Sequence, residues 1–361
     1  MNVNAFYLSS GGHGGNRHGS GFTNALKEFT TVHCYPWDAD RAGGQPVQQD
    51  EPAVVVPGHE NNFAVAVGPM NRMGEVFGRY KVGFTVWETT RIPGPRLADL
   101  ANVDEVWIPS SWGREILMNN HIEEARIHIV PEGVDAQLFK PGVKERSGDR
   151  PFRFLCVAKW ETRKGIDVLV KAFSKAFRPD DDVELVMHCH NPYLSGFSME
   201  KTFHRFGIRS HAPVIFSKPV PDPVLVDLYN SCDAFVLPTR GEGWGLPILE
   251  AMSCGKPVIV TNYSAPRDFV NTDCGYPVEV ESMITVFDPY FFNTDFDYGQ
   301  WANPSVDHLV EIMRHVYRNP DEAAGKGLAA RQQVETLWTW RLSAQKAARR
   351  LRDLEATPAD A

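Results

Sequence analysis

Residues 234–260 read AFVLPTRGEGWGLPILEAMSCGKPVIV, in which two apolar runs enclose a glycine-punctuated loop and a short helical segment. This order predicts strand, loop, helix and strand. Pro247 suits the first helical position, where its missing N–H costs nothing, and Gly255 suits the left-handed residue after the last turn. Both apolar runs lack alternation, as expected of strands in a parallel sheet that is covered on both faces. The stretch therefore predicts an α/β fold.

The loop before this helix predicts a ligand site. Amide groups at a helix start point toward the loop, and Gly243 and Gly245 carry no side chain that would keep a phosphate from the backbone. Glu242 and Glu250 bracket the turn, neither with an obvious salt-bridge partner, and acids placed there can accept hydrogen bonds from sugar hydroxyls. The residues thus indicate a nucleotide-sugar. In the alternative interpretation, Glu250 only complements the helix dipole and Glu242 is a solvated loop acid.

These residues resemble the E-x7-E motif of family 4 retaining glycosyltransferases: Glu242-Gly-Trp-Gly-Leu-Pro-Ile-Leu-Glu250-Ala-Met, followed by Gly255-Lys-Pro-Val-Ile. The resemblance covers nearly the whole chain and implies a GT-B fold, with two doubly wound Rossmann-like domains facing across a cleft. It implies that Glu242 touches the donor sugar and that Glu250 binds the ribose hydroxyls. The backbone of the turn would cradle the sugar and the phosphates, which assigns donor binding to Gly243, Trp244, Gly245 and Leu246.

A glycine-rich loop follows the first apolar run, Val3 to Leu8, and precedes a helix that we expect to begin near Phe22. Its spacing does not meet the dinucleotide-binding fingerprint, so the residues alone leave open a flexible surface loop. The resembled family opens with a loop of this kind across the cleft from the donor diphosphate. The resemblance therefore predicts that Gly12, Gly14 and Gly15 approach the donor, that His13 is catalytic, and that Asn16, Arg17 and His18 face substrate.

Three cations lie in the loop after the apolar run Phe152 to Val157, at Lys159, Arg163 and Lys164. Without the resemblance they would fit a solvated loop about as well. The resembled family places an Arg, and five residues later a Lys, against the diphosphate, and this spacing falls on Lys159 and Lys164. Because Lys lacks the bidentate fork of Arg, the main diphosphate ligand is either Lys159 or Arg163. The resemblance also places the backbone near Val220 against the nucleobase.

Polar residues near other predicted strand ends are candidates for the acceptor side. His59 follows an apolar run, and Trp87 and Glu88 end another. Parallel sheets place ligands at such strand ends. Ordinary turn and core positions explain these residues equally well.

Two D-x-D patterns, Asp38 with Asp40 and Asp295 with Asp297, are similar to the metal-binding motif of a different class of glycosyltransferases. Neither follows a strong strand, and the resembled family needs no metal. We therefore expect solvated loop acids, and we predict no metal or other cofactor.

Composition bounds the class of protein. The formal charge of −8, from 37 Lys and Arg against 45 Asp and Glu, argues against a chain-wide affinity for nucleic acid. The six cysteines show no C-x-x-C pairing and fit small core positions. The first residues lack a basic and then apolar leader, and no run of 18 apolar residues occurs. We expect a soluble, cytoplasmic protein without a transmembrane segment, and peripheral membrane contact stays open.

At 361 residues the chain suits two domains. We expect an acceptor-side domain over residues 1–141, a linker over 142–150 and a nucleotide-sugar-binding domain over 151–335. The resemblance implies that a final helix within residues 336–361 crosses back to the first domain.

The resemblance implies a hexosyltransferase-type enzyme that moves a sugar from a nucleoside diphosphate sugar, carrying UDP or GDP, to an acceptor hydroxyl with retention at the anomeric carbon. Charge stabilisation on the leaving diphosphate would matter more than a covalent nucleophile. The alternatives are a catalytically silent nucleotide-sugar-binding protein and a GT-B isomerase. The sugar, the base and the acceptor (glycan, glycolipid or small molecule) stay open. The predicted catalytic set is Lys159, Lys164, Glu242 and His13.

Overall fold

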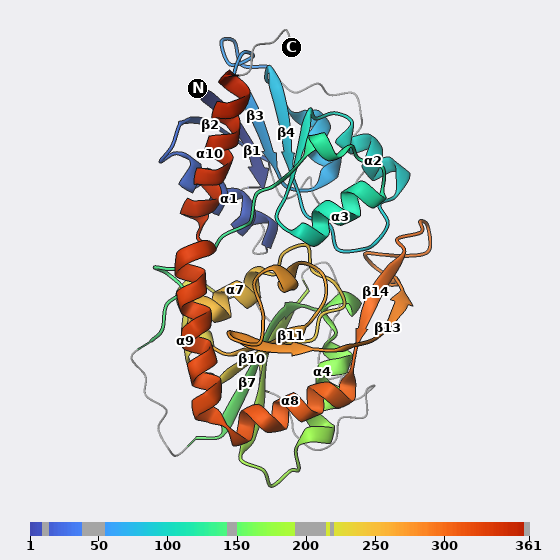
Figure 1. The fold of residues 1–361 in the computed structure, drawn as a ribbon, viewed down its shortest axis with the longest axis vertical. Helices are drawn as coiled ribbons and strands as arrows, with labels where there is room; N and C mark the ends of the chain where they lie inside the picture. Colours follow the sequence, from blue (N-terminus) through green and yellow to red (C-terminus); the bar gives the residue numbers. More distant parts are fainter. Residues whose placement is uncertain (9–13, 38–54, 143–149, 192–213, 217–219, 357–361) are drawn as a thin grey trace. The chain divides into compact units, whose positions relative to one another are not determined.

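The computed structural model describes residues 1–8, 14–37, 55–142, 150–191, 214–216 and 220–356. The chain forms two compact units, Met1–Asp135 together with Trp338–Ala361, and Ala136–Leu337. Each unit contains a six-stranded parallel sheet with helices packed around it (Figure 1). The predicted α/β class with two Rossmann-like sheets is confirmed.

The sheet of the first unit has the strand order β2-β1-β3-β4-β5-β6. All five residues of its central strand β3 are buried, as expected of a strand covered on both faces. The strands are β1 (Asn2–Leu8), β2 (Thr31–Trp37), β3 (Phe63–Val67), β4 (Tyr80–Phe84), β5 (Glu105–Ile108) and β6 (Ile127–Ile129). The helices are α1 (Gly14–Leu26), α2 (Gly94–Leu100), α3 (Ser111–Asn119) and α10 (Trp340–Ala356), with short 3-10 helices η2 (Met70–Glu75) and η3 (Glu124–Arg126).

Helix α10 completes the core of the first unit from the far end of the sequence. It lies beside α1 (Figure 1). The small side chains on its buried face allow the two helices to approach closely, and the chain re-enters the unit where Val134 N donates to Trp338 O at 2.9 Å. The core residues that α10 contributes are Ala344, Ala347, Ala348 and Leu351.

The sheet of the second unit has the order β12-β11-β10-β7-β8-β9. Its strands are β7 (Phe152–Lys159), β8 (Val183–His190), β9 (Val214–Phe216), β10 (Ala234–Leu237), β11 (Val258–Thr261) and β12 (Gly275–Val278). The helices are α4 (Ile166–Ala176), α6 (Asp222–Asn230), α7 (Leu246–Ser253), α8 (Val306–Arg318) and α9 (Pro320–Leu337), with 3-10 helices η4 (Thr162–Lys164) and η5 (Ala265–Asp268). A separate antiparallel hairpin pairs β13 (Val280–Thr285) with β14 (Gln300–Pro304).

The boundary between the units lies at residue 135, earlier than the predicted end of the first domain at residue 141. Phe139 is the reason, because its ring packs on Tyr229 at 6.0 Å and its carbonyl accepts hydrogen bonds from Ser253 and Arg331. These contacts tie residues 136–141 to the second unit. Most of the predicted linker, residues 143–149, lies outside the described residues.

None of the helices in the described part of the chain combines the length and apolarity that crossing a bilayer requires. Five of the six cysteines are buried free thiols, in agreement with their interpretation as small core residues, whereas Cys34 is exposed.

Candidate active site

The stretch 234–260 folds as strand β10, a loop, helix α7 and strand β11, as predicted, and the two strands pair in parallel. Gly255 adopts the predicted left-handed conformation, with φ of 69°. Helix α7 begins at Leu246, so Pro247 occupies its second rather than its first position, where an N–H is equally dispensable. Gly245 precedes the helix with φ of 112°, a conformation that favours glycine.

Glu242 is the centre of a buried cluster of charges, and only 4% of its surface is exposed. Lys164 Nζ donates to Glu242 Oε1 at 2.7 Å, and Arg163 Nη1 donates to Oε2 at 3.2 Å. Thr239 Oγ1 donates to Oε1 at 3.0 Å. Burial raises the pKa of Glu242, but the Lys164 and Arg163 charges outweigh burial and leave that pKa below its usual value. The interpretation of Glu242 as an acid without an obvious partner is therefore wrong.

Glu161 connects Lys159, the third of the predicted cations, to this cluster. Its Oε1 lies 2.5 Å from Lys159 Nζ, and its Oε2 accepts from Arg163 Nη2 at 3.0 Å. Burial opposes ionisation, but the charges of Arg163, Lys159 and Lys164 lower the pKa of Glu161 to about 2. Sequence reasoning missed Glu161. The signal was present, because an acid stands between cations in the run Lys159 to Lys164.

The three cations differ in their access to solvent. The side chain of Lys159 is 27% exposed, whereas those of Arg163 and Lys164 are 7% and 9% exposed. Burial, reinforced by the neighbouring Arg163 charge, lowers the pKa of Lys164, and Glu242 opposes this effect. Of the three, Lys159 is therefore the most accessible to an incoming anion.

Backbone and side-chain contacts hold residues 159–165, which carry the three cations, against the loop of residues 238–242. Gly165 has φ of 65°, and a Cβ there would lie 1.9 Å from the carbonyl oxygen of Pro238, so only glycine permits this approach. Arg240 N donates to Arg163 O at 2.7 Å, and the Arg240 guanidinium makes two 2.8 Å bonds to Asp167 at the start of α4. The cluster is thus fixed from both loops.

Glu250 lies on the buried face of α7, and Tyr229 OH from α6 donates to its Oε2 at 2.8 Å. The Trp244 side chain is also buried and packs on Phe269 with ring centroids 5.0 Å apart. Its indole is therefore a core element, and the predicted cradle at residues 243–246 would act through backbone amides. Val220 lies just before α6 and is partly exposed.

The glycine-rich loop is only partly described. Gly12 and His13 lie outside the described residues, whereas Gly14 and Gly15 open helix α1. The helix expected near Phe22 thus begins at residue 14, and the interpretation of Gly14 and Gly15 as loop residues is wrong. Helix α1 extends N-terminally because each residue adds a backbone hydrogen bond once a packed helix has formed.

His18 does not face solvent, and it is 3% exposed in the core of the first unit. Its Nδ1 lies 3.2 Å from Glu132 Oε1, and its ring meets Phe84 edge-on at 4.3 Å. Burial lowers the pKa of His18 to about 3, so the ring is neutral.

The acceptor-side candidates lie in separate parts of the first unit. His59 is the last residue of a turn at residues 56–59, and its Nδ1 lies 2.5 Å from Tyr35 OH. Trp87 and Glu88 follow strand β4 and are partly exposed, and Trp87 Nε1 donates to Arg91 O at 3.2 Å.

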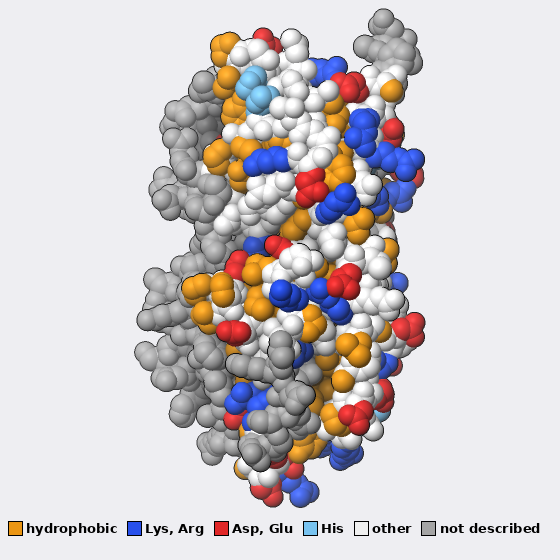
Figure 2. All heavy atoms as spheres, turned by 90° about the vertical axis from the view of Figure 1, so that its left-hand side faces the viewer, with side chains coloured by type: hydrophobic (Ala, Val, Ile, Leu, Met, Phe, Trp, Pro, Cys, Tyr) orange, Lys and Arg blue, Asp and Glu red, His pale blue; other side chains and the backbone are white. Residues whose placement is uncertain are grey.

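No group of three or more metal-ligating side chains occurs among the residues that the structure describes. Asp38 and Asp40 fall outside that part of the chain. Asp295 accepts from Asn293 Nδ2 at 2.7 Å and Asp297 from Gly299 N at 2.8 Å, so both acids shape a loop. The face in Figure 2 shows Lys and Arg side chains interspersed with Asp and Glu rather than gathered into one basic surface.

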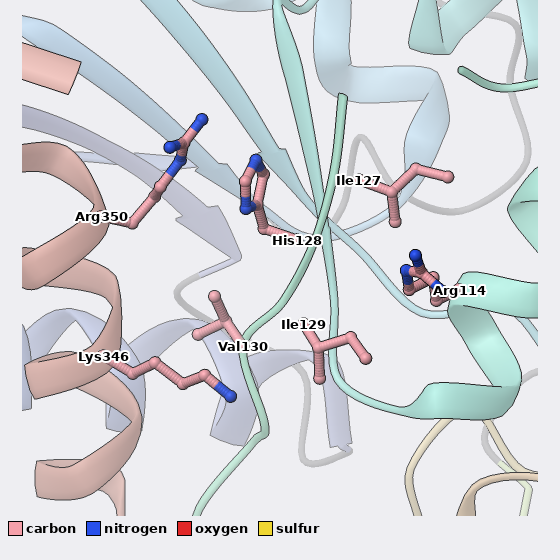
Figure 3. Close-up of a pocket in the computed structure, with 7 residues that line it drawn as sticks. All are labelled: Arg114, Ile127, His128, Ile129, Val130, Lys346 and Arg350. Atoms are coloured by element: carbon pink, nitrogen blue, oxygen red, sulfur yellow. The ribbon is translucent and has the colours of Figure 1, made fainter. Parts of the chain in front are cut away.

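A cavity of about 340 Å³ lies in the first unit, between strand β6 and helix α10 (Figure 3). It contains none of the predicted site residues. Arg350 lies 3.0 Å from Glu105, and His128 lies 3.3 Å from it. The Glu105 carboxylate therefore compensates part of the positive charge of the side chains that line the cavity. The lining residues are Arg114, Ile127, His128, Ile129, Val130, Lys346 and Arg350.

Comparison with known sequences connects the second unit to a family. Residues 151–286 match the family described as Glycosyl transferases group 1. A GDP-mannose-dependent alpha-(1-6)-phosphatidylinositol monomannoside mannosyltransferase of Mycobacterium tuberculosis (strain CDC 1551 / Oshkosh) is 28% identical over 293 residues, which are 77% of this chain and 68% of that protein. A D-inositol 3-phosphate glycosyltransferase of Paenarthrobacter aurescens (strain TC1) is 33% identical over 148 residues, 38% of this chain and 35% of that protein.

Solved structures extend the likeness to the whole fold. Sucrose-phosphate synthase from Thermosynechococcus elongatus superposes with a TM-score of 0.72 at 16% identity, over 99% of both chains. Anabaena Alr3699/HepE in complex with UDP-glucose gives a TM-score of 0.69 at 13% identity, over 98% of this chain and 100% of that one. These likenesses show the GT-B fold. The chain is thus similar to the group 1 glycosyl transferases in the sequence of residues 151–286, and similar to solved glycosyltransferases in its fold.

Proposed function

We propose that this protein is a retaining, metal-independent glycosyltransferase that moves a sugar from a nucleoside diphosphate sugar to an acceptor hydroxyl. The observation that carries the proposal is the buried cluster of Lys159, Glu161, Arg163, Lys164 and Glu242 beside the start of α7. Three cations against two carboxylates leave one positive charge, and the helix start adds backbone amides. A diphosphate is the anion that this combination suits.

The same groups would promote departure of the diphosphate. Negative charge grows on its bridging oxygen as the bond to the sugar breaks, and preorganised donors stabilise that charge in the transition state. Lys159 is the accessible cation, and Glu161 holds its ammonium at 2.5 Å. We assign the main diphosphate contact to Lys159 and a positioning role to Arg163, whose Nη1 donates to Gly241 O at 2.9 Å.

Glu242 and Glu250 receive different roles in this proposal. Glu242 is held by Lys164, Arg163 and Thr239, and a carboxylate with two oxygens retains acceptor capacity for a donor-sugar hydroxyl. Glu250, held by Tyr229, would accept from the ribose hydroxyls. The roles of both residues rest on their resemblance to the E-x7-E motif.

We propose only the chemical class of the donor, a nucleoside diphosphate sugar. One relative is named as GDP-mannose-dependent, and the HepE structure contains UDP-glucose. We therefore take GDP-mannose and UDP-glucose as the first donors to test. The acceptor, the sugar and the base are left to experiment.

The deciding experiment incubates the full-length protein with a panel of nucleotide sugars and measures release of free nucleoside diphosphate. Release that depends on one donor, together with an NMR spectrum showing the donor's anomeric configuration in the product, is the expected result. Binding of a nucleotide sugar with neither transfer nor hydrolysis would indicate a catalytically silent binding protein instead. An inverted product would contradict retention.

A further inference from the structure

The connection between β13 and β14, residues 286–299, carries an unusual concentration of aromatic side chains, and we call it the aromatic loop. Phe287, Tyr290 and Phe296 are 52%, 68% and 46% exposed. Among the large apolar residues that are exposed in the described part of the chain, these three are the aromatic ones. Exposed apolar groups gathered in one place mark an interaction site more often than scattered ones do.

The aromatic loop is attached to the cation cluster through Asp288. Asp288 Oδ2 accepts from Thr162 N at 2.9 Å, and Thr162 stands between Glu161 and Arg163 in the sequence. Asp288 Oδ1 accepts from the backbone N–H groups of Tyr290 and Phe291, at 2.9 and 3.2 Å. The Phe291 ring lies under Lys159 Nζ at 5.1 Å. One buried carboxylate therefore fixes the exposed tip of the loop next to the proposed diphosphate ligand.

A second set of rings supports the loop from inside. Phe292 packs edge-on against Trp301 of β14 at 5.2 Å and against Tyr298 at 5.1 Å. Trp301 is fully buried. Because Phe292, Tyr298 and Trp301 pack on one another, they support the part of the loop that carries the exposed rings.

The charges of the aromatic loop select among ligand classes. Residues 286–299 contain no Lys, Arg or His, but they contain Asp288, Asp295 and Asp297. Anionic membranes and nucleic acids are bound through basic side chains, so neither fits this loop. A sugar ring fits, because its apolar C–H face can pack on an aromatic face while its hydroxyls donate to carboxylates. Asp295 accepts from Asn293 Nδ2 and Asp297 from Gly299 N, and a carboxylate group has acceptor sites for more than one hydrogen bond.

We propose that the aromatic loop binds the acceptor, and that this acceptor contains at least one sugar ring, which stacks on Tyr290 and its neighbours. The inference rests on the proposed transferase function and adds the chemical class of its acceptor. The family match spans residues 151–286 and therefore includes only the first residue of the loop.

The test uses full-length protein and a glycan array, followed by kinetics with the best saccharide and the preferred donor. Tyr290→Ala and Phe296→Ala should each raise the acceptor KM about tenfold, as expected from loss of one ring contact. Tyr290→Phe should keep most of the affinity, because it keeps the ring. Leu328→Ala, at a 67% exposed apolar position on α9, is the matched control and should change nothing.

Nucleotide affinity and acceptor-free donor hydrolysis are measured on the same variants, and both should stay at the wild-type value. An active transferase whose acceptor KM is unchanged in Tyr290→Ala and Phe296→Ala would overturn the acceptor-loop proposal and leave the proposed function intact. A protein that binds no nucleotide sugar would overturn the proposed function instead. Loop variants that abolish self-association on size exclusion while leaving saccharide binding unchanged would show that the loop binds a second copy, and would overturn the saccharide proposal.

Discussion

Lys164 Nζ lies 2.7 Å from Glu242 Oε1, although 78 residues separate them in the chain and both side chains are buried. Two buried charges in such contact compensate each other's desolvation, and neither is tolerated alone. This pair links the strand-to-helix loop after β7 with the loop before α7, and it gives the first prediction.

Glu242→Ala should destabilise the protein by about 3 to 5 kcal/mol, because it leaves Lys164 and Arg163 buried without their shared carboxylate. Denaturant unfolding of the variant and the wild type measures the difference. Glu311→Ala, at an exposed acid on α8, is the control and should change stability by less than about 0.5 kcal/mol. Equal midpoints for Glu242→Ala and the wild type would contradict the buried pair.

Glu161 should make stability depend on acid pH. Its folded-state pKa of about 2 lies below the ordinary value of 4.5, so its stabilisation is complete above about pH 4.5 and is lost as the pH falls toward 2. The loss should be on the order of 3 kcal/mol. Unfolding of the wild type and Glu161→Gln across this range should show a shallower pH dependence in the variant. Parallel curves would mean that Glu161 is not held as an anion.

Lys159→Ala should lower kcat/KM roughly 100-fold, because the accessible ammonium stabilises charge on the leaving diphosphate. The midpoint of unfolding should change less than in Glu242→Ala, because Arg163 still pairs with Glu161 when Lys159 is removed. Lys175→Ala, at an exposed lysine paired with Asp307, serves as the control. Steady-state kinetics with the preferred donor measures this effect. Wild-type turnover in Lys159→Ala would contradict the assignment and would make Arg163 the candidate for the main diphosphate contact.

Glu250→Ala should weaken nucleotide binding by about 1.5 to 3 kcal/mol, the value of a hydrogen bond to a charged acceptor. Calorimetry with UDP and GDP measures it. Tyr229→Phe removes the phenol that holds Glu250 and should cause a smaller loss. Unchanged affinity for both nucleotides in Glu250→Ala would remove Glu250 from the site.

Under the proposed function, chelation should leave the transfer rate unchanged, because the lysines, the arginine and the helix-start amides would supply the positive charge that a metal ion could otherwise provide. The measurement is activity before and after EDTA treatment. Loss of activity that manganese restores would make Asp38 and Asp40 the first ligands to mutate.

The local sequence determined the strand–loop–helix–strand order of residues 234–260. Gly255 and the apolar runs of β10 and β11 act through backbone conformation and burial, which depend mainly on the residues themselves. The resemblance carried by Glu242 to Glu250 predicted the GT-B fold, because these residues are contiguous and can be recognised in the sequence without the tertiary structure.

The start of α1 and the partners of Glu242 could not be predicted in this way. Helix α1 begins at Gly14 although five of its first eight residues, 14–21, are glycine or serine, because packing of Phe22, Leu26 and α10 outweighs weak helix propensity. Burial lowers the pKa of His18, and the rings of Phe84 and Trp340, which are distant in the sequence, pack against its ring. Lys164, Arg163 and Glu242 become a compensated cluster because Gly165 lets two loops approach to backbone contact. Their charge state depends on desolvation by residues far away in the chain, and only the tertiary structure decides which residues those are.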